Sequence, residues 1–152
     1  MGSRYLLGAG GGFSIVAALL HIAIIFGGAD WYRFFGAGEG MARLTESGST
    51  YPTMVTSAIA SVLLVWGLYG LSGARAIPRL PLLPFALVLI GGVYLLRGVA
   101  GLVLLFLPEH PIAAENSPLF WLVSSLVCLV PGTLYLLGVI TQWGELRAGR
   151  TR

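Results

Sequence analysis

The chain has 152 residues, of which 57% are hydrophobic and only 10% are charged, and its formal net charge is +3. Soluble domains carry about 25% charged residues, so this composition has too few charges to cover a water-soluble surface. The nine basic residues are also too few and too dispersed to form a nucleic-acid-binding face, which excludes nucleic acid as a partner. We therefore expect an all-α integral membrane protein whose first partner is the lipid bilayer.

The apolar residues fall into four continuous blocks, each long enough to cross about 30 Å of hydrocarbon as a helix. The blocks show no polar-apolar alternation, which favours helices over a β-barrel. The predicted spans are residues 5–28, 53–73, 80–107 and 119–143. Because the connection between the second and third spans is tight, we expect a single four-transmembrane-helix domain, residues 1–152, with up-down-up-down topology.

Four aromatic residues follow the first span in close succession: Trp31, Tyr32, Phe34 and Phe35. Such side chains prefer the headgroup level of a membrane. We expect the outer loop, residues 28–52, to lie on the outer leaflet as a lid, or to be an interfacial anchor that binds no ligand. Its stretch from Glu39 to Leu44 is predicted to be a short helix in which Glu39 pairs with Arg43, four residues later.

Two basic side chains lie within the predicted spans, His21 in the first and Arg97 in the third. Burying a charged side chain at the centre of a membrane costs about 2.5 to 3.5 kcal/mol, so such a residue usually faces the bundle and has a partner. Counting about 1.5 Å per residue from the outer ends places the two within about one helical turn in depth. No acidic residue lies within a predicted span, so Arg97 is expected to meet Asp30 or Glu39, another outer-loop carboxylate, or a bound anionic group.

Polar residues at a matching depth come from the other spans. Ser57 and Ser61 share one face of the second span, and Trp121 and Ser125 share a face of the fourth. The predicted ligand-binding residues in the outer half of the bundle are His21, Asp30, Glu39, Ser57, Ser61, Tyr94, Arg97, Trp121 and Ser125. The inner half of the core is expected to be almost entirely apolar.

The distribution of arginines predicts the orientation of the bundle. Six of them fall on one side of a four-span arrangement: Arg4, Arg75, Arg79, Arg147, Arg150 and Arg152. Short loops rich in basic residues stay in the cytoplasm. Both chain ends are therefore expected on the cytoplasmic side of a bacterial inner membrane.

The segment FFGAGEGMARL, which follows the first of four short spans, resembles the DoxX-like group of small bacterial inner-membrane proteins. A glycine- and aromatic-rich stretch with a basic residue before leucine occurs near the first span of that group. The resemblance implies a four-helix membrane fold and a link to quinone or sulfur redox chemistry. It transfers no catalytic residue to this chain.

These patterns favour a protein that binds an amphipathic ligand, a quinone or a lipid, in the outer half of the bundle. One alternative is a structural or accessory subunit of a homo-oligomer or larger membrane complex; another is a membrane enzyme that uses His21 and Arg97. The lone Cys128 excludes a dithiol relay, and no metal site is predicted. Haem is disfavoured because the second histidine, His110, lies in a loop.

Overall fold

The computed structural model describes residues 2–148, and no strand occurs within that range. The elements in chain order are α1 (Gly2–Phe34), α2 (Glu39–Glu46), α3 (Tyr51–Gly73), α4 (Leu83–Leu104), α5 (Pro111–Ala114) and α6 (Pro118–Ala148). Four of them, α1, α3, α4 and α6, are long and apolar enough to cross a membrane, which confirms the all-α class and the four predicted helices. Arg150 and Arg152 of the predicted basic tail lie outside the described residues.

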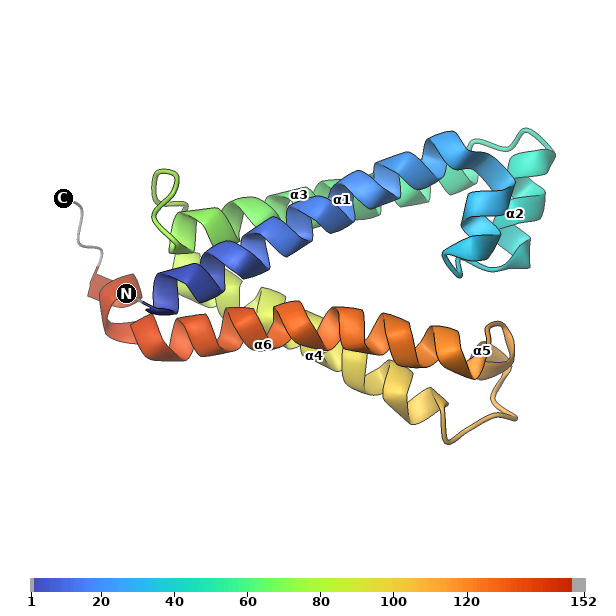
Figure 1. The fold of residues 1–152 in the computed structure, drawn as a ribbon. Helices are drawn as coiled ribbons and strands as arrows, with labels where there is room; N and C mark the ends of the chain where they lie inside the picture. Colours follow the sequence, from blue (N-terminus) through green and yellow to red (C-terminus); the bar gives the residue numbers. More distant parts are fainter. Residues whose placement is uncertain (1, 149–152) are drawn as a thin grey trace.

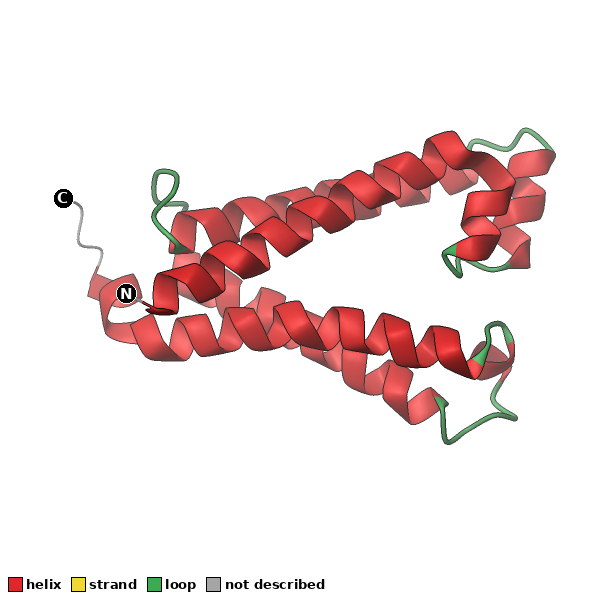
Figure 2. Ribbon diagram, in the orientation of Figure 1, coloured by secondary structure: helices red, strands yellow, loops and turns green. Residues whose placement is uncertain are grey.

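The four long helices form two pairs, α1 with α3 and α4 with α6 (Figure 1). The pairs lie close together where α1 begins and α6 ends, and they diverge toward α2 and α5. We call the end where the pairs meet the terminal end; it includes the α3–α4 connection at residues 74–82. The opposite end, with α2 and α5, is the loop end. Loops are confined to these two ends (Figure 2).

The helix boundaries differ from the predicted ones for identifiable local reasons. The first helix continues past residue 28 to Phe34, but it bends at Gly28, whose φ of 68° is a conformation that glycine adopts without strain. Helix α4 begins at Leu83, later than predicted, because Leu82 stands before it with a φ of 51°. The predicted short helix within residues 39–44 is confirmed as α2.

Each pair is held by glycines that let backbones approach closely. In the first pair, a Cβ atom placed on Gly11 would lie 2.8 Å from the Gly67 carbonyl oxygen. In the second pair, a Cβ atom on Gly98 would lie 2.6 Å from the Leu129 side chain. These short distances explain why small residues recur along the predicted spans.

One hydrophobic core joins the two pairs over the terminal half of the bundle, from Leu7 and Leu146 to Ala18 and Tyr94. A separate small cluster of Ile24, Tyr32 and Ala42 packs α2 against the bent end of α1. The pairs therefore share their buried core on the terminal side and are less tightly joined toward the loop end. The core of the terminal half is mainly apolar, as expected, but it also buries Ser72 and Gln142, which the sequence did not predict.

Candidate functional site

The two helix pairs meet at a hydrogen-bonded cluster in the middle of the bundle. The Ser14 hydroxyl lies 3.0 Å from the Tyr94 hydroxyl and 3.1 Å from the Tyr135 hydroxyl. Tyr135 donates in turn to the carbonyl oxygen of Trp66 at 2.8 Å. All four long helices contribute to this cluster, which we call the tyrosine crossing. The Tyr94 hydroxyl, predicted to contact a ligand, is engaged here by Ser14.

The aromatic rings of the tyrosine crossing also pack against one another. Tyr94 and Tyr135 stack with their centroids 6.2 Å apart and their planes at 13°. The Trp66 ring meets Tyr94 edge-on at 5.0 Å. Offset and edge-to-face arrangements of this kind stabilise aromatic pairs. The crossing is therefore a structural junction, and the predicted site residues Arg97, Trp121 and Ser125 lie beyond it toward the loop end.

Arg97 lies one helical turn beyond Tyr94 on α4 and packs against Trp121 of α6. The residue is exposed, so the expectation that it faces the inside of the bundle is wrong. Its guanidinium carbon lies 5.5 Å from the centroid of the Trp121 ring, a cation–π distance. The Trp121 ring is held in place because its Nε1 atom donates to the Ala113 carbonyl oxygen at 3.1 Å. The Arg97 side chain is therefore positioned by an aromatic face, and within residues 2–148 its N–H donors are left free for other partners.

Ser125 completes this cluster with a buried hydroxyl that lacks a partner. The residue is 0% exposed, and its Oγ atom makes no hydrogen bond to any of residues 2–148. A Cβ atom on Gly101 would lie 2.2 Å from that Oγ atom and 2.8 Å from Nη1 of Arg97. The hydroxyl and the guanidinium thus converge on the bare backbone of Gly101. We call Arg97, Gly101, Trp121 and Ser125 the Arg97 cluster.

The predicted contact between Arg97 and Asp30 or Glu39 is wrong. Arg33 takes both carboxylates, at 3.5 Å from Asp30 and 2.8 Å from Glu39, and a third, Glu46, at 2.8 Å. These residues are close to Arg33 in sequence, and the bend at Gly28 turns Arg33 toward α2, so the loop satisfies its own charges. Within residues 2–148, Arg97 has no carboxylate within 4.0 Å.

Within residues 2–148, no hydrogen bond or ion pair joins the remaining predicted site residues to the Arg97 cluster. His21 is half-buried, and its Nδ1 atom lies 2.8 Å from the Ala17 carbonyl oxygen of its own helix. Ser57 and Ser61 are exposed, and Ser61 donates to the Ser57 carbonyl oxygen. The buried face of α3 instead carries Thr56 and the glycines that contact α1. These glycines are the sequence feature that could have identified the buried face of α3.

The loop end contains an ion-pair cluster around Arg33, in which the carboxylate of Glu39 has a lowered pKa. Hydrogen bonds from Arg33, and then from Arg43, lower the pKa of Glu39 from 4.5 to about 2. The Arg43 contact, at 3.1 Å, confirms the pair predicted from the sequence. A carboxylate with a lowered folded-state pKa contributes stability above its unfolded pKa, and loses it as the pH falls through the folded value.

We therefore expect the contact between Arg33 and Glu39 to persist from pH 4.5 down to about pH 2 and to be lost below it. Carbon-13 NMR of the Glu39 carboxyl in detergent micelles measures its titration midpoint directly. In the variant Arg33→Gln, the midpoint should rise toward 4.5 because the first of its two arginine donors is gone. A midpoint that Arg33→Gln leaves unchanged contradicts the assigned pairing.

Comparison with protein-family models, curated proteins and solved structures finds no match to this chain. Within residues 2–148, no group of three or more His, Cys, Asp or Glu side chains could hold a metal ion. Within the same range, the Arg97 cluster combines a cation without a carboxylate, a buried hydroxyl without a partner, and an aromatic face.

Proposed function

We propose that this chain is a multi-pass protein of a bacterial inner membrane, in which α1, α3, α4 and α6 cross the bilayer in up-down-up-down order. The support is the length and apolar composition of these helices. The terminal end carries Arg4, Arg75, Arg79 and Arg147. Because basic residues are retained in the cytoplasm, this end faces the cytoplasm and the loop end faces outward.

Within that bundle, the Arg97 cluster binds the head of an amphipathic molecule, a quinone or a lipid. The observation that carries this proposal is the unpartnered Ser125 hydroxyl beside the guanidinium of Arg97. A buried hydroxyl without a hydrogen bond costs about 1 to 3 kcal/mol, and a basic group at membrane depth needs a partner. A carbonyl or phosphate oxygen near Gly101 accepts from both residues and removes both penalties.

The surroundings of the cluster suit the rest of such a ligand. The Trp121 ring packs against the guanidinium, and the outward faces of α4 and α6 carry apolar residues such as Leu96 and Leu122 for an acyl or isoprenoid tail. The DoxX-like resemblance belongs to the same proposal, since it adds quinones to the ligands to be tested. In the accessory-subunit alternative, the unpaired Arg97 meets a carboxylate of a partner protein instead.

The test uses two adjacent serines as a matched pair. Ser124→Ala removes a hydroxyl that already donates to its own helix, at 3.3 Å from the Trp121 carbonyl oxygen. Ser125→Ala removes the free hydroxyl of the cluster. In the full chain in mild detergent, native mass spectrometry measures binding of a short-chain ubiquinone and of dioleoyl phosphatidylglycerol in separate titrations. The probe that binds in an Arg97-dependent way identifies the ligand class.

We expect Arg97→Gln to weaken binding about ten- to a hundred-fold, because a charge-assisted hydrogen bond is lost. Ser125→Ala should weaken it about three- to ten-fold without lowering the melting temperature of the ligand-free protein, since the lost hydroxyl makes no internal bond. Ser124→Ala should leave binding unchanged. Retained binding in both Arg97→Gln and Ser125→Ala refutes the site; an Arg97-dependent partner protein with neither probe bound favours the accessory subunit.

A further inference from the structure

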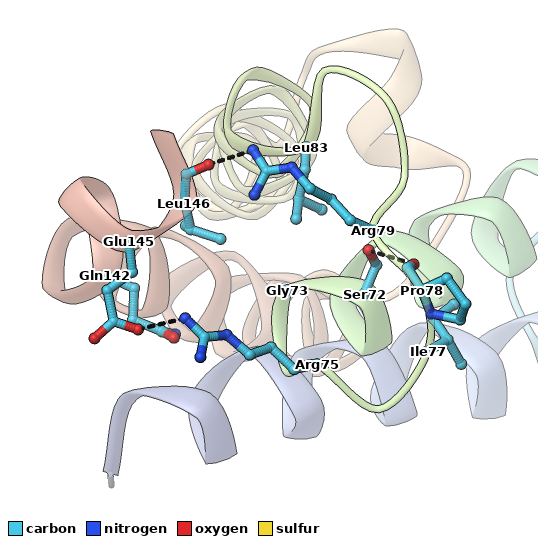
Figure 3. Close-up of a pocket in the computed structure, with 10 residues that line it drawn as sticks. All are labelled: Ser72, Gly73, Arg75, Ile77, Pro78, Arg79, Leu83, Gln142, Glu145 and Leu146. Atoms are coloured by element: carbon cyan, nitrogen blue, oxygen red, sulfur yellow. Dashed lines mark hydrogen bonds and ion pairs between the residues drawn. The ribbon is translucent and has the colours of Figure 1, made fainter. Parts of the chain in front are cut away.

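The terminal end of the bundle contains a cavity of about 510 Å³, separate from the Arg97 cluster. It lies between the end of α3, the α3–α4 connection, the start of α4 and the end of α6 (Figure 3). Its polar lining consists of Ser72, Arg75, Arg79, Gln142 and Glu145. Of these residues, Ser72 and Gln142 are buried, and they are the polar groups that the sequence pattern did not predict here.

The cavity and its margin carry an excess of positive charge. Arg75 lies 2.7 Å from Glu145, and Arg4 approaches the same carboxylate at 3.9 Å. Arg79 has no carboxylate within 4.0 Å in the described part of the chain. Three arginines therefore lie at the cavity with one carboxylate, which pairs with only two of them, and an anionic ligand would complete the balance of charge.

Arg79 has a structural role that uses only part of its hydrogen-bonding capacity. Its Nη2 atom donates to the Leu146 carbonyl oxygen, so it satisfies a carbonyl in the last turn of α6 (Figure 3). A guanidinium has five N–H donors in a planar fork. The donors that Leu146 does not use remain on a side chain that lines the cavity.

The backbone of the α3–α4 connection is fixed so that both arginines line the cavity. Arg75 has a φ of 63°, a left-handed conformation in which glycine is the usual residue after a helix. The Ser72 hydroxyl donates to the Pro78 carbonyl oxygen at 3.1 Å and accepts from the Leu80 N–H at 2.9 Å. These two bonds bracket Arg79 in the chain and hold the connection against α3.

Gln142 supplies a further polar group from α6. It is only 4% exposed, yet within residues 2–148 its side chain makes a single, long hydrogen bond, from Nε2 to the Gly138 carbonyl oxygen at 3.4 Å. Its side chain lines the cavity with the arginines (Figure 3). An amide beside two guanidinium groups offers additional N–H donors to an oxyanion.

We propose that this cavity binds a phosphate group, with Arg79 and Arg75 as the principal donors and Gln142 as a further one. Guanidinium forks match phosphate oxygens in geometry and charge. Basic pockets between membrane helices on the cytoplasmic side are suited to anionic headgroups. The phosphate comes either from an anionic lipid or from a soluble phosphate ester, and the site does not depend on the ligand of the Arg97 cluster.

The test titrates the full chain in detergent with dioleoyl phosphatidylglycerol, with dioleoylglycerol, which lacks the phosphate, and with inorganic phosphate. Native mass spectrometry gives the affinity for each probe. Arg79→Gln should weaken binding of the phosphate-bearing probe about ten-fold or more. Glu145→Gln, an exposed position, should strengthen it because Arg75 and Arg4 lose their competing carboxylate. Arg147→Gln is the matched control, since Arg147 packs over Trp143 and does not line the cavity.

Binding of inorganic phosphate identifies a soluble source, and binding of phosphatidylglycerol alone identifies a lipid. Weaker binding in Arg79→Gln together with tighter binding in Glu145→Gln supports the site. An unchanged affinity in Glu145→Gln overturns it, even if Arg79→Gln binds less, because loss of Arg79 also removes the bond to the end of α6. Equal binding of dioleoylglycerol and phosphatidylglycerol overturns it as well.

Discussion

Gly70→Ala is expected to push α1 away from α3 and to destabilise the protein by about 3 kcal/mol, the upper part of the range for overpacking. A Cβ atom on Gly70 would lie 2.5 Å from the Cα atom of Gly11 and 2.7 Å from its nitrogen. Both contacts are with backbone, which cannot rotate out of the way as a flexible side chain can. The helix pair can accept the methyl group only by separating.

The matched control is Gly92→Ala on α4, where an added Cβ atom meets nothing within 4 Å. Alanine is the better helix former by about 1 kcal/mol, so this variant should unfold at the same temperature as the parent or at a higher one. Thermal unfolding in dodecyl maltoside, followed by circular dichroism, compares both variants with the parent. If Gly70→Ala melts with the parent, the close contact of α1 with α3 is wrong.

The number and order of the long helices could be predicted because hydropathy depends on composition over about twenty residues. Their ends could not, because ends depend on single residues. Gly28 bends α1 without ending it, and Leu82 delays the start of α4. In both places the decisive property is one backbone torsion angle, which a long apolar run does not reveal.

The face that each helix presents to its neighbours was harder to predict than the helix itself. A helix in a bilayer is apolar on its lipid side as well, so hydrophobic periodicity does not separate inside from outside. The serines at 57 and 61 follow a helical spacing and are nevertheless exposed. Small residues would have identified the buried face of α3 better, since Gly67 and Gly70 contact α1 directly.

The candidate site was predicted in part. Arg97, Trp121 and Ser125, chosen from depth and helical spacing, do converge between α4 and α6. The prediction of a carboxylate partner for Arg97 was wrong because no periodic sequence pattern indicates how the connection after the first helix folds. Arg33 and the bend at Gly28 decide where Asp30 and Glu39 go.

Tyr135→Phe is expected to loosen the two helix pairs from one another and to cost about 1 to 2 kcal/mol. The Tyr135 hydroxyl joins α6 to Ser14 of α1 at 3.1 Å and to the Trp66 carbonyl oxygen of α3 at 2.8 Å. Tyr94→Phe should lower the free energy of unfolding by less, because within residues 2–148 that hydroxyl makes a single hydrogen bond, with Ser14. Tyr51→Phe is the control, since Tyr51 is 56% exposed and lies at the start of α3.

Two measurements separate this effect from general destabilisation. Thermal unfolding gives the order of the three variants, and electron–electron double resonance gives the distance between spin labels at Ser47 and Glu109, which are exposed at the loop ends of the two pairs. Cys128 is first replaced by serine so that only the introduced cysteines react. Because the shared core ends near the tyrosine crossing, loss of the Tyr135 hydroxyl should broaden this distance distribution more than Tyr94→Phe does. An unchanged distribution would mean that packing alone sets the angle between the pairs.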